Sequence, residues 1–226
     1  MKKLPPKSRK SPNDGSKKNH ITKYERHSKT KMTHGNSCMT SQSVNNKLQK
    51  IRDLTHTCKP TIVAIQETWG WNFLTDYSIK GFHPPVIQPR KGDSMNMGGG
   101  VGIWISEKTD FERINSPFVD KIIESLTIHL LTLKTIIINL YCPFGDKREC
   151  YTKLDSHLQA VTNKWPTHDL ILVGDLSTDL LLDSQWTDEL GNISINHNLL
   201  QQVTLPTRVT DTNATQGPIK NYKQMS

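Results

Sequence analysis

The apolar run at residues 170–173 constrains the fold of this chain more than any other stretch of the sequence. Its four consecutive residues, Leu-Ile-Leu-Val, have the pattern of a strand buried on both faces. Gly174 ends the run, and Asp175 follows it directly. A carboxylate at the end of a buried strand can be aimed into a site from a rigid base, and an ordinary aspartate turn gives the same local pattern. Asp175 is therefore a candidate that needs support from the rest of the chain.

Other strand-length runs also lead to a polar residue. Residues 61–66 form a run that ends at Glu67, and residues 133–140 form a run that ends at Tyr141. Further extended segments are predicted over residues 84–88, 101–105 and 122–130, and from Pro206 to Thr207. We expect these strand ends to converge on one edge of the fold.

Two helical patterns alternate with the predicted strands. Apolar residues at helical spacing predict a helix over residues 44–57, with Ser43 as its N-cap. A second helix is predicted over residues 147–164, and residues 196–203 fit either a short helix or a loop. The alternation of strands with helices and hairpins predicts a layered α/β fold.

The positive charge of the chain is concentrated at its N-terminal end. The 226 residues carry a formal net charge of +8, and residues 1–31 contain eleven Lys or Arg against two Asp or Glu. This polar segment has too few apolar residues to offset the entropy lost on ordering. We predict a basic disordered tail at residues 1–35 and a folded domain at residues 36–226. The tail has the charge to bind a polyanion or to act as a nuclear address, or it is only a solvated leader.

Several classes of protein do not fit the sequence. No run of 18 apolar residues occurs, so no membrane-spanning helix is expected, and the N-terminus lacks the apolar stretch of a secretory signal. We therefore expect an intracellular protein, nuclear or cytoplasmic, with no membrane partner. The cysteines lack zinc-binding spacing and are expected to be free thiols; they are Cys38, Cys58, Cys142 and Cys150.

Five short motifs follow one another along the chain. They are Gln66-Glu67-Thr68-Trp69, Gly98-Gly99-Gly100-Val101, Asn139-Leu140-Tyr141-Cys142-Pro143, Val173-Gly174-Asp175-Leu176-Ser177 and Pro206-Thr207-Arg208. Their order and spacing resemble the endonuclease/exonuclease/phosphatase superfamily, and the most similar branch is the apurinic-type endonuclease domain of non-LTR retrotransposons. The resemblance covers residues 40–215. Each motif alone is weak; the three glycines, for example, also fit a hairpin bend or a close strand contact.

The resemblance implies an α/β fold of four layers, with two mixed sheets face to face and helices outside. It also implies hydrolysis of DNA phosphodiesters with Mg2+ (or Mn2+) as cofactor. Glu67 matches the metal-binding glutamate, and Asp175 matches the aspartate that orients or deprotonates the attacking water. Tyr141 matches a tyrosine that supports the phosphate or leaving group, and Thr207 matches a phosphate-contacting threonine. Together, a metal and aimed donors neutralise the charge of an anionic ester while a water is oriented.

The sequence departs from the family pattern in three places. Ser177 stands where the family has an asparagine after Gly-Asp-Phe, and Thr40 stands where the first asparagine is expected. A serine hydroxyl is shorter than the asparagine amide and rotates freely, and loss of one aimed donor costs about two to three orders of magnitude in rate. The Ile-Asp and Ser-Asp-His motifs of the family's last strands do not occur in these residues. We therefore expect a domain that lacks its last strands.

These features leave three hypotheses about function. The first is an active, metal-dependent DNA endonuclease of the retrotransposon type. The second is a catalytically impaired remnant that at most binds nucleic acid through its basic tail. The third keeps the fold but acts on phosphorylated lipids or sugars, and the Thr-Arg and Gly-Gly-Gly-Val motifs make it the least favoured. Arg90 and Lys91 either touch DNA phosphates or face solvent.

Overall fold

The computed structural model describes residues 22–26, 37–40, 44, 47–69, 76–90, 98–115, 122–143, 145–180 and 182–202. The strands are β1 (Thr22–Arg26), β2 (Ser37–Thr40), β3 (Ile62–Gln66), β4 (Val86–Gln88), β5 (Val101–Ile105), β6 (Phe111–Ile114), β7 (Glu124–Leu130), β8 (Thr135–Tyr141), β9 (Asp169–Asp175) and β10 (Leu199–Gln201). The helices are α1 (Leu48–Cys58), α2 (Lys147–Lys164) and α3 (Gln185–Asn196).

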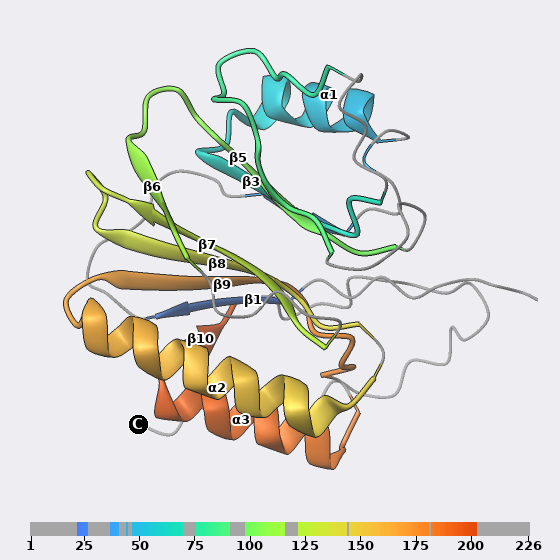
Figure 1. Cartoon of the computed structure of the whole chain (residues 1–226), viewed down its shortest axis with the longest axis vertical. Helices are drawn as coiled ribbons and strands as arrows, with labels where there is room; N and C mark the ends of the chain where they lie inside the picture. The colour runs from blue at the N-terminus through green and yellow to red at the C-terminus, as the bar shows by residue number, and fades with distance from the viewer. Residues whose placement is uncertain are drawn as a thin grey trace, which may run out of the picture.

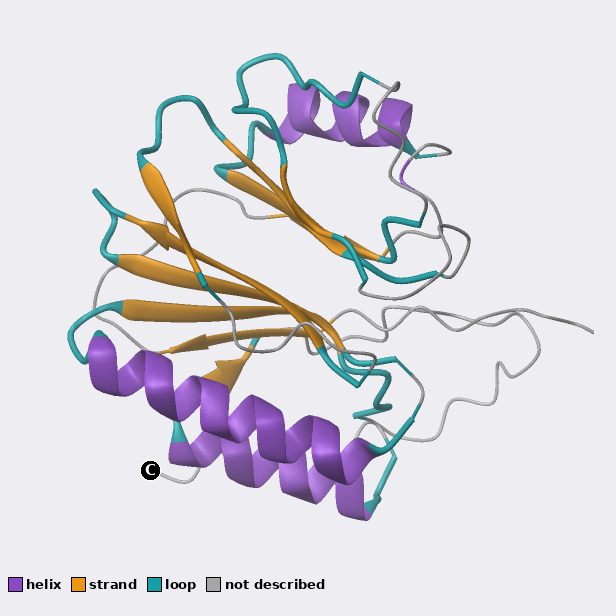
Figure 2. Ribbon diagram, viewed as in Figure 1, coloured by secondary structure: helices purple, strands orange, loops and turns teal. Residues whose placement is uncertain are grey.

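The described strands form two mixed sheets that face each other (Figure 1). One sheet has the strand order β10-β1-β9-β8-β7-β6, and the other has the order β2-β3-β5-β4. Helix α1 covers the outer face of the smaller sheet, whereas α2 and α3 cover the outer face of the larger one (Figure 2). The layers are therefore helix, sheet, sheet and helix, which confirms the predicted four-layer α/β sandwich.

Three apolar clusters fill the spaces between these four layers. The central cluster, between the sheets, includes Ile103, Ile137 and Val173. Their neighbours along the strands face the outer layers: Trp104 packs in the cluster beneath α1, and Leu172 packs in the cluster beneath α2 and α3. The apolar runs are continuous along the sequence because both faces of each strand are buried, as predicted for residues 170–173.

Helix α2 begins and ends where the sequence predicts, whereas α1 begins later. The Asp146 side chain caps α2 by accepting a hydrogen bond from the Glu149 N–H. The predicted helix over residues 44–57 is observed as Leu48–Cys58, and the predicted cap Ser43 lies outside the described residues. Val44 is buried, and its N–H donates to the Thr68 carbonyl at 3.3 Å. That contact ties residue 44 to the end of β3 and delays the start of the helix.

Strand β6 and helix α3 are not among the elements predicted from the sequence. The predicted short helix or loop at residues 196–203 is instead the end of α3 followed by β10. The helical signal lies further upstream, because Trp186, Leu190 and Ile193 recur at helical spacing and pack against the cluster beneath the larger sheet. Ser184 caps α3 by accepting from the Thr187 N–H. Of the helices within the described ranges, none is long and apolar enough to cross a membrane.

Strand β1 lies inside the segment for which the sequence predicts a disordered tail. Its backbone pairs antiparallel with β9 on one side and with β10 on the other. The structure therefore differs from the prediction at these five residues. Backbone pairing of this kind needs little from the side chains, since the N–H and C=O groups along β9 supply the partners. The other residues of the predicted tail lie outside the described part of the chain.

Two cysteines correct the prediction of free thiols. Cys142 and Cys150 form a disulfide, and Cys58 is free and exposed. Residues 142 and 150 lie on the two sides of the connection from β8 to α2, which brings their Cα atoms to 6.5 Å. This separation is within the range of disulfide-bonded pairs. The eight-residue spacing in the sequence carries no recognisable signal for this pairing.

Candidate active site

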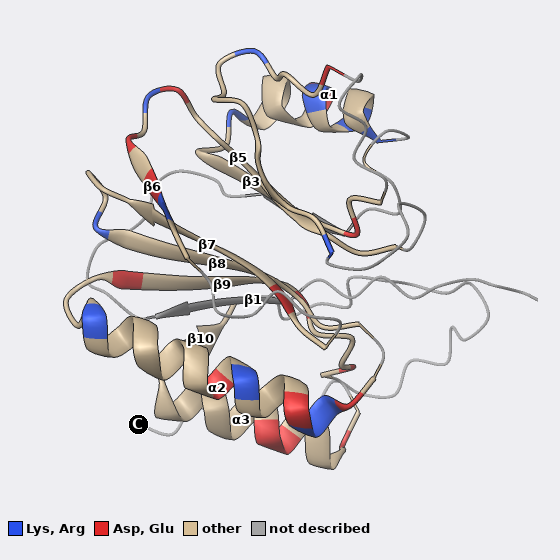
Figure 3. Cartoon of the chain, viewed as in Figure 1, with Lys and Arg blue, Asp and Glu red and all other residues tan. Residues whose placement is uncertain are grey.

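Three polar residues lie in one row at an end of the larger sheet. In the antiparallel pairing of β7 with β8, Glu124 is the register partner of Tyr141. In the parallel pairing of β8 with β9, Tyr141 is the register partner of Asp175. The order β7-β8-β9 thus places Glu124, Tyr141 and Asp175 side by side across three strands. Figure 3 shows acidic residues of both sheets at this end of the sandwich.

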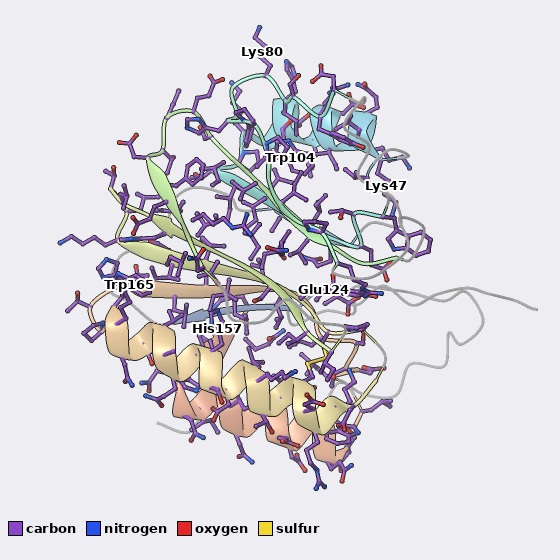
Figure 4. The ribbon with its side chains drawn as sticks, viewed as in Figure 1. Lys47, Lys80, Trp104, Glu124, His157 and Trp165 are labelled. Atoms are coloured by element: carbon purple, nitrogen blue, oxygen red, sulfur yellow. A yellow bond between two sulfur atoms is a disulfide. The ribbon has the colours of Figure 1, made fainter. Side chains whose placement is uncertain are left out.

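Strand alternation turns this row toward the facing sheet. Ile137, Ile171 and Val173, which share strand parity with Tyr141 or Asp175, all belong to the cluster between the sheets. Figure 4 shows Glu124 in the space between the two sheets. The site is therefore formed at one end of the inter-sheet layer, where the facing sheet can contribute residues of its own.

Asn139 connects the two sheets immediately behind the site. This fully buried side chain donates to the Ile65 carbonyl at 2.9 Å and to the Gly102 carbonyl at 3.0 Å. Its Oδ1 accepts a hydrogen bond from the Gln66 amide. Since Gln66 precedes Glu67 and Asn139 lies two residues before Tyr141, these bonds fix the end of β3 against the end of β8. Asn139 belongs to one of the five motifs, but its role as a link between the sheets depends on contacts that the motif does not reveal.

Glu67 comes from the smaller sheet and meets Tyr141. The Tyr141 hydroxyl donates to Glu67 Oε1 at 2.5 Å, and both residues are buried. Burial raises the pKa of Tyr141 well above its usual value, and the charges of Glu67 and Asp175 raise it further. The phenol is consequently a neutral hydrogen-bond donor at physiological pH. Both carboxylates act on it, so the structure brings together Glu67, Tyr141 and Asp175 as a group.

The backbone at Glu67 is held in an uncommon conformation. Its φ is +57°, which lies in the left-handed region that few non-glycine residues adopt. Hydrogen bonds on its C-terminal side maintain this bend: the Thr68 N–H donates to the Gly100 carbonyl at 3.2 Å, and the Trp69 N–H donates to the Gly99 carbonyl at 3.1 Å. Such a conformation persists only where the surroundings fix it, and it is often found at functional sites.

The three glycines approach their neighbours closely, as one of the two sequence-based interpretations predicts. A Cβ on Gly99 would collide with the Arg90 guanidinium, and a Cβ on Gly100 would collide with the Thr68 hydroxyl. Both glycines also have positive φ. Residues 98–100 are therefore a close strand contact beside the site.

Arg90 is a half-buried ion-pair residue and does not simply face solvent. Its Nε bonds to Glu124, whose other carboxylate oxygen accepts from the Gly100 N–H. Burial raises the pKa of Glu124, while the Arg90 charge opposes this rise. The guanidinium carbon lies 5.8 Å from the centre of the Tyr141 ring. The Arg90 charge is therefore held beside the Glu124 carboxylate and over the Tyr141 ring. Lys91 lies outside the described residues.

Asp175 and Ser177 are held by a tight loop after β9. Asp175 Oδ1 accepts from the Ser177 N–H at 2.7 Å, and the Asp175 carbonyl accepts from the Cys142 N–H at 2.8 Å. The Ser177 hydroxyl donates to the Cys142 carbonyl at 2.8 Å. Ser177 is therefore near the predicted site, but its hydroxyl is bonded to the backbone. Thr207 lies outside the described residues.

The carboxylates fit a magnesium ion better than a metal that needs a full set of protein ligands. No group of three or more His, Cys, Asp or Glu side chains suited to a metal occurs within the described residues. Mg2+ keeps several waters and is usually held by one or two carboxylates together with substrate phosphate. Glu67 carries carboxylate oxygens of this kind directly after β3, so the donor type is one that Mg2+ prefers.

Comparison with known proteins shows similarity of fold but none of sequence. No family model and no curated protein matches the chain. The endonuclease domain of TRAS1, a telomere-specific non-LTR retrotransposon, superposes with a TM-score of 0.50 at 16% identity, over 72% of this chain and 71% of that one. The 3'-5' exonuclease NExo from Neisseria meningitidis gives 0.48 at 18% identity over 70% of each chain. The human Nocturnin catalytic domain gives 0.47 at 15% identity over 67% and 63%.

The match to the TRAS1 endonuclease domain bears on the fold of this chain. The chain shares the fold of that domain, an α/β sandwich of two mixed sheets, in agreement with the fold that the sequence motifs predict. The TRAS1 endonuclease domain belongs to the same retrotransposon branch that the motifs resemble. The similarity establishes the architecture of the two sheets, and the chemistry has to be argued from the residues themselves.

Proposed function

We propose that this chain is a divalent-metal-dependent phosphodiesterase that cleaves DNA, of the kind found in non-LTR retrotransposons. One observation carries the proposal: Glu67 and Asp175, from different sheets, act on the single phenol of Tyr141. Two like charges buried around one neutral donor cost folding free energy. Such an arrangement is expected where a substrate or cation balances the charge during function.

Each described residue has a distinct part in this reaction. Asp175 orients a water or accepts its proton, because its carboxylate lies at a strand end and is aimed by the Ser177 N–H. Tyr141 stays protonated and donates to an oxygen of the phosphate or leaving group. Glu67 would hold Mg2+ or Mn2+ through a carboxylate oxygen. When bound, such a cation would neutralise phosphate charge and polarise the ester.

Arg90 extends the site toward an anionic substrate. Glu124 holds the Nε side of its guanidinium, and the side chain remains 22% exposed. A guanidinium fixed in this way presents donors to a phosphate oxygen without a large loss of side-chain entropy. We propose that Arg90 contacts a DNA phosphate, and that Thr207 is a second phosphate contact. Such an enzyme works where DNA is present, so we also propose an intracellular location.

A plasmid assay tests the proposed activity and substrate together. Supercoiled plasmid incubated with the protein and Mg2+ should be converted to the nicked form, and EDTA should abolish the conversion. Binding of Mn2+, followed by electron paramagnetic resonance, should weaken in Glu67→Gln but not in Glu107→Gln, an exposed acid outside the site. Hydrolysis of a phosphorylated inositol in preference to plasmid would instead support the lipid or sugar hypothesis.

The Ser177 geometry favours a second candidate, a catalytically impaired domain that binds nucleic acid. Its hydroxyl donates to the Cys142 carbonyl and so cannot also donate to a leaving oxygen. If the basic tail then provides the binding, replacing its seven Lys and Arg within residues 1–21 with glutamine should weaken DNA binding and reduce its salt dependence. Unchanged affinity and salt slope would exclude the tail as the binding element.

A further inference from the structure

Lys147, the first residue of α2, reaches across to the loop that follows β9. Its Nζ donates to the Leu176 carbonyl and to the Thr178 hydroxyl oxygen, the latter at 3.3 Å. One helical turn further along, the Tyr151 hydroxyl lies 2.5 Å from the same Thr178 oxygen. Two side chains on one face of α2 therefore hold both ends of the segment 176–178.

That segment supplies a hydrogen bond to the Asp175 carboxylate. Ser177, its central residue, donates its N–H to Asp175 Oδ1 at 2.7 Å. The backbone at Ser177 has φ of +48°, so this donor is presented by a conformation that needs support from its surroundings. The bonds of Lys147 lie on either side of Ser177, at Leu176 and Thr178. Loss of the Lys147 ammonium would remove its bonds on both sides of Ser177 and leave Tyr151 as the α2 residue that still contacts Thr178.

The electrostatic surroundings place this ammonium in the field of the candidate base. Burial lowers the pKa of Lys147 to about 8, and the negative charge of Asp175 on β9 opposes the decrease. From α2 itself, the Tyr151 phenol shares the Thr178 contact, and burial raises its pKa to about 12, so it remains neutral. From α3, Glu189 acts on Tyr151. The charge of Lys147 therefore changes near pH 8, whereas the Tyr151 phenol stays neutral there.

We propose that Lys147 is a positioning residue for the proposed phosphodiesterase, and that its ammonium holds segment 176–178 so that Asp175 points toward Tyr141 and Glu67. The inference rests on the proposed function. It also explains how the site compensates for Ser177, whose hydroxyl is bonded to Cys142. The ordered backbone N–H of Ser177, together with the Lys147 ammonium that fixes it, provides the alignment that the family assigns to an asparagine.

The kinetic test compares Lys147→Met and Lys147→Arg with Lys80→Met, an exposed control (Figure 4). Misplacement of a reacting group by about 1 Å costs about 100-fold in rate, so Lys147→Met should lower kcat by up to that factor with KM little changed. The arginine variant and the control should retain most of the activity.

The wild-type rate should fall above a pH of about 8 as Lys147 loses its proton. In Lys147→Arg this alkaline decrease should be absent, because arginine keeps its charge.

Other kinetic outcomes would overturn the inference. Wild-type kcat in Lys147→Met would show that the loop needs no ammonium. A rise in KM at unchanged kcat would make Lys147 a substrate contact and not a positioning residue. An alkaline decrease that persists unchanged in Lys147→Arg would assign it to another group.

A measurement without substrate separates this inference from the proposed function. In ¹⁵N-labelled protein, the Ser177 amide resonance should move with a midpoint near pH 8 in the wild type and stay constant over that range in Lys147→Arg. In Lys147→Met it should be displaced at every pH. If these shifts are observed and the wild type cleaves no DNA, the proposed function fails while the loop contact stands. If the wild type cleaves DNA and the shifts are absent, the positioning role of Lys147 fails.

Discussion

Replacing Gly174 with alanine should destabilise the domain by about 4 kcal/mol, combining about 1–3 kcal/mol each for overpacking and for backbone strain. A Cβ at this position would collide with the carbonyl oxygen of Leu140 and would lie 2.7 Å from its carbonyl carbon and 2.9 Å from its nitrogen. All three atoms belong to the backbone, so no side-chain rotation relieves the contact. The φ of Gly174 is +148°, which also disfavours a residue with a Cβ.

The collision acts on the strand pair that carries the site. Gly174 is the register partner of Leu140, and the next pair along is Tyr141 with Asp175. Separation of β8 and β9 at this point would weaken their hydrogen bonds and move Asp175 away from the phenol. The alanine variant should consequently lose catalytic activity at temperatures where it is still folded.

Thermal and urea unfolding of Gly174→Ala and Gly191→Ala provide the assay. At about 2–4 °C per kcal/mol for a domain of this size, Gly174→Ala should lower Tm by roughly 8–16 °C. Gly191 lies within α3, and a Cβ there meets nothing within 4 Å. The same substitution at Gly191 should stabilise by about 1 kcal/mol through helix propensity. The urea midpoint and the measured m-value give the free energy of unfolding of each variant. A free energy for Gly174→Ala within 1 kcal/mol of the wild-type value would refute the close approach of β8 and β9.

Two further predictions concern the buried polar groups. Asn139→Leu should lower the free energy of unfolding by about 3 kcal/mol, because three hydrogen bonds that join the sheets are lost and the Gln66 amide loses its acceptor; unchanged urea unfolding would show that the link contributes little. His157 lies on the buried face of α2, where it contacts Thr127 (Figure 4), and burial lowers its pKa to about 4 from 6.5. The neutral ring is the form that the folded state favours, so this stability is complete above pH 6.5 and is lost as pH falls through 4, by up to about 3 kcal/mol. His157→Gln should remove that part of the pH dependence, and equal urea midpoint shifts in both proteins between pH 7 and pH 4 would contradict the assignment.

The sequence predicts the buried strands that carry Glu67, Tyr141 and Asp175 because their pattern is local, and the four-layer architecture follows from the resemblance of its motifs to the family. The runs that end at Glu67, Tyr141 and Asp175 are all observed as strands, and α2 matches its predicted bounds. Each of these elements is long, strongly apolar on its buried faces or capped by a recognisable residue. The fold class follows from their alternation.

The sequence does not predict features that depend on pairing between distant segments. The backbone of β1 pairs with β9 and β10, and its own residues give no apolar signal. The disulfide between Cys142 and Cys150 depends on the turn from β8 into α2. Asn139 and Lys147 act through contacts with segments far along the chain. The partners of β1, Asn139 and Lys147 are distant in sequence, and the two cysteines, eight residues apart, meet only because of the turn between β8 and α2, so a local pattern reveals none of these contacts.

The initial rate of plasmid nicking with Mg2+ tests the central claim most directly. The rate is measured for the wild type, Glu67→Gln, Asp175→Asn and the exposed control Asp183→Asn. If Glu67 and Asp175 form one catalytic site, both variants lose activity at unchanged Tm, their double variant is no slower than either alone, and the control matches the wild type. Full activity in either site variant would contradict the account. So would a folded wild-type protein that leaves the plasmid intact.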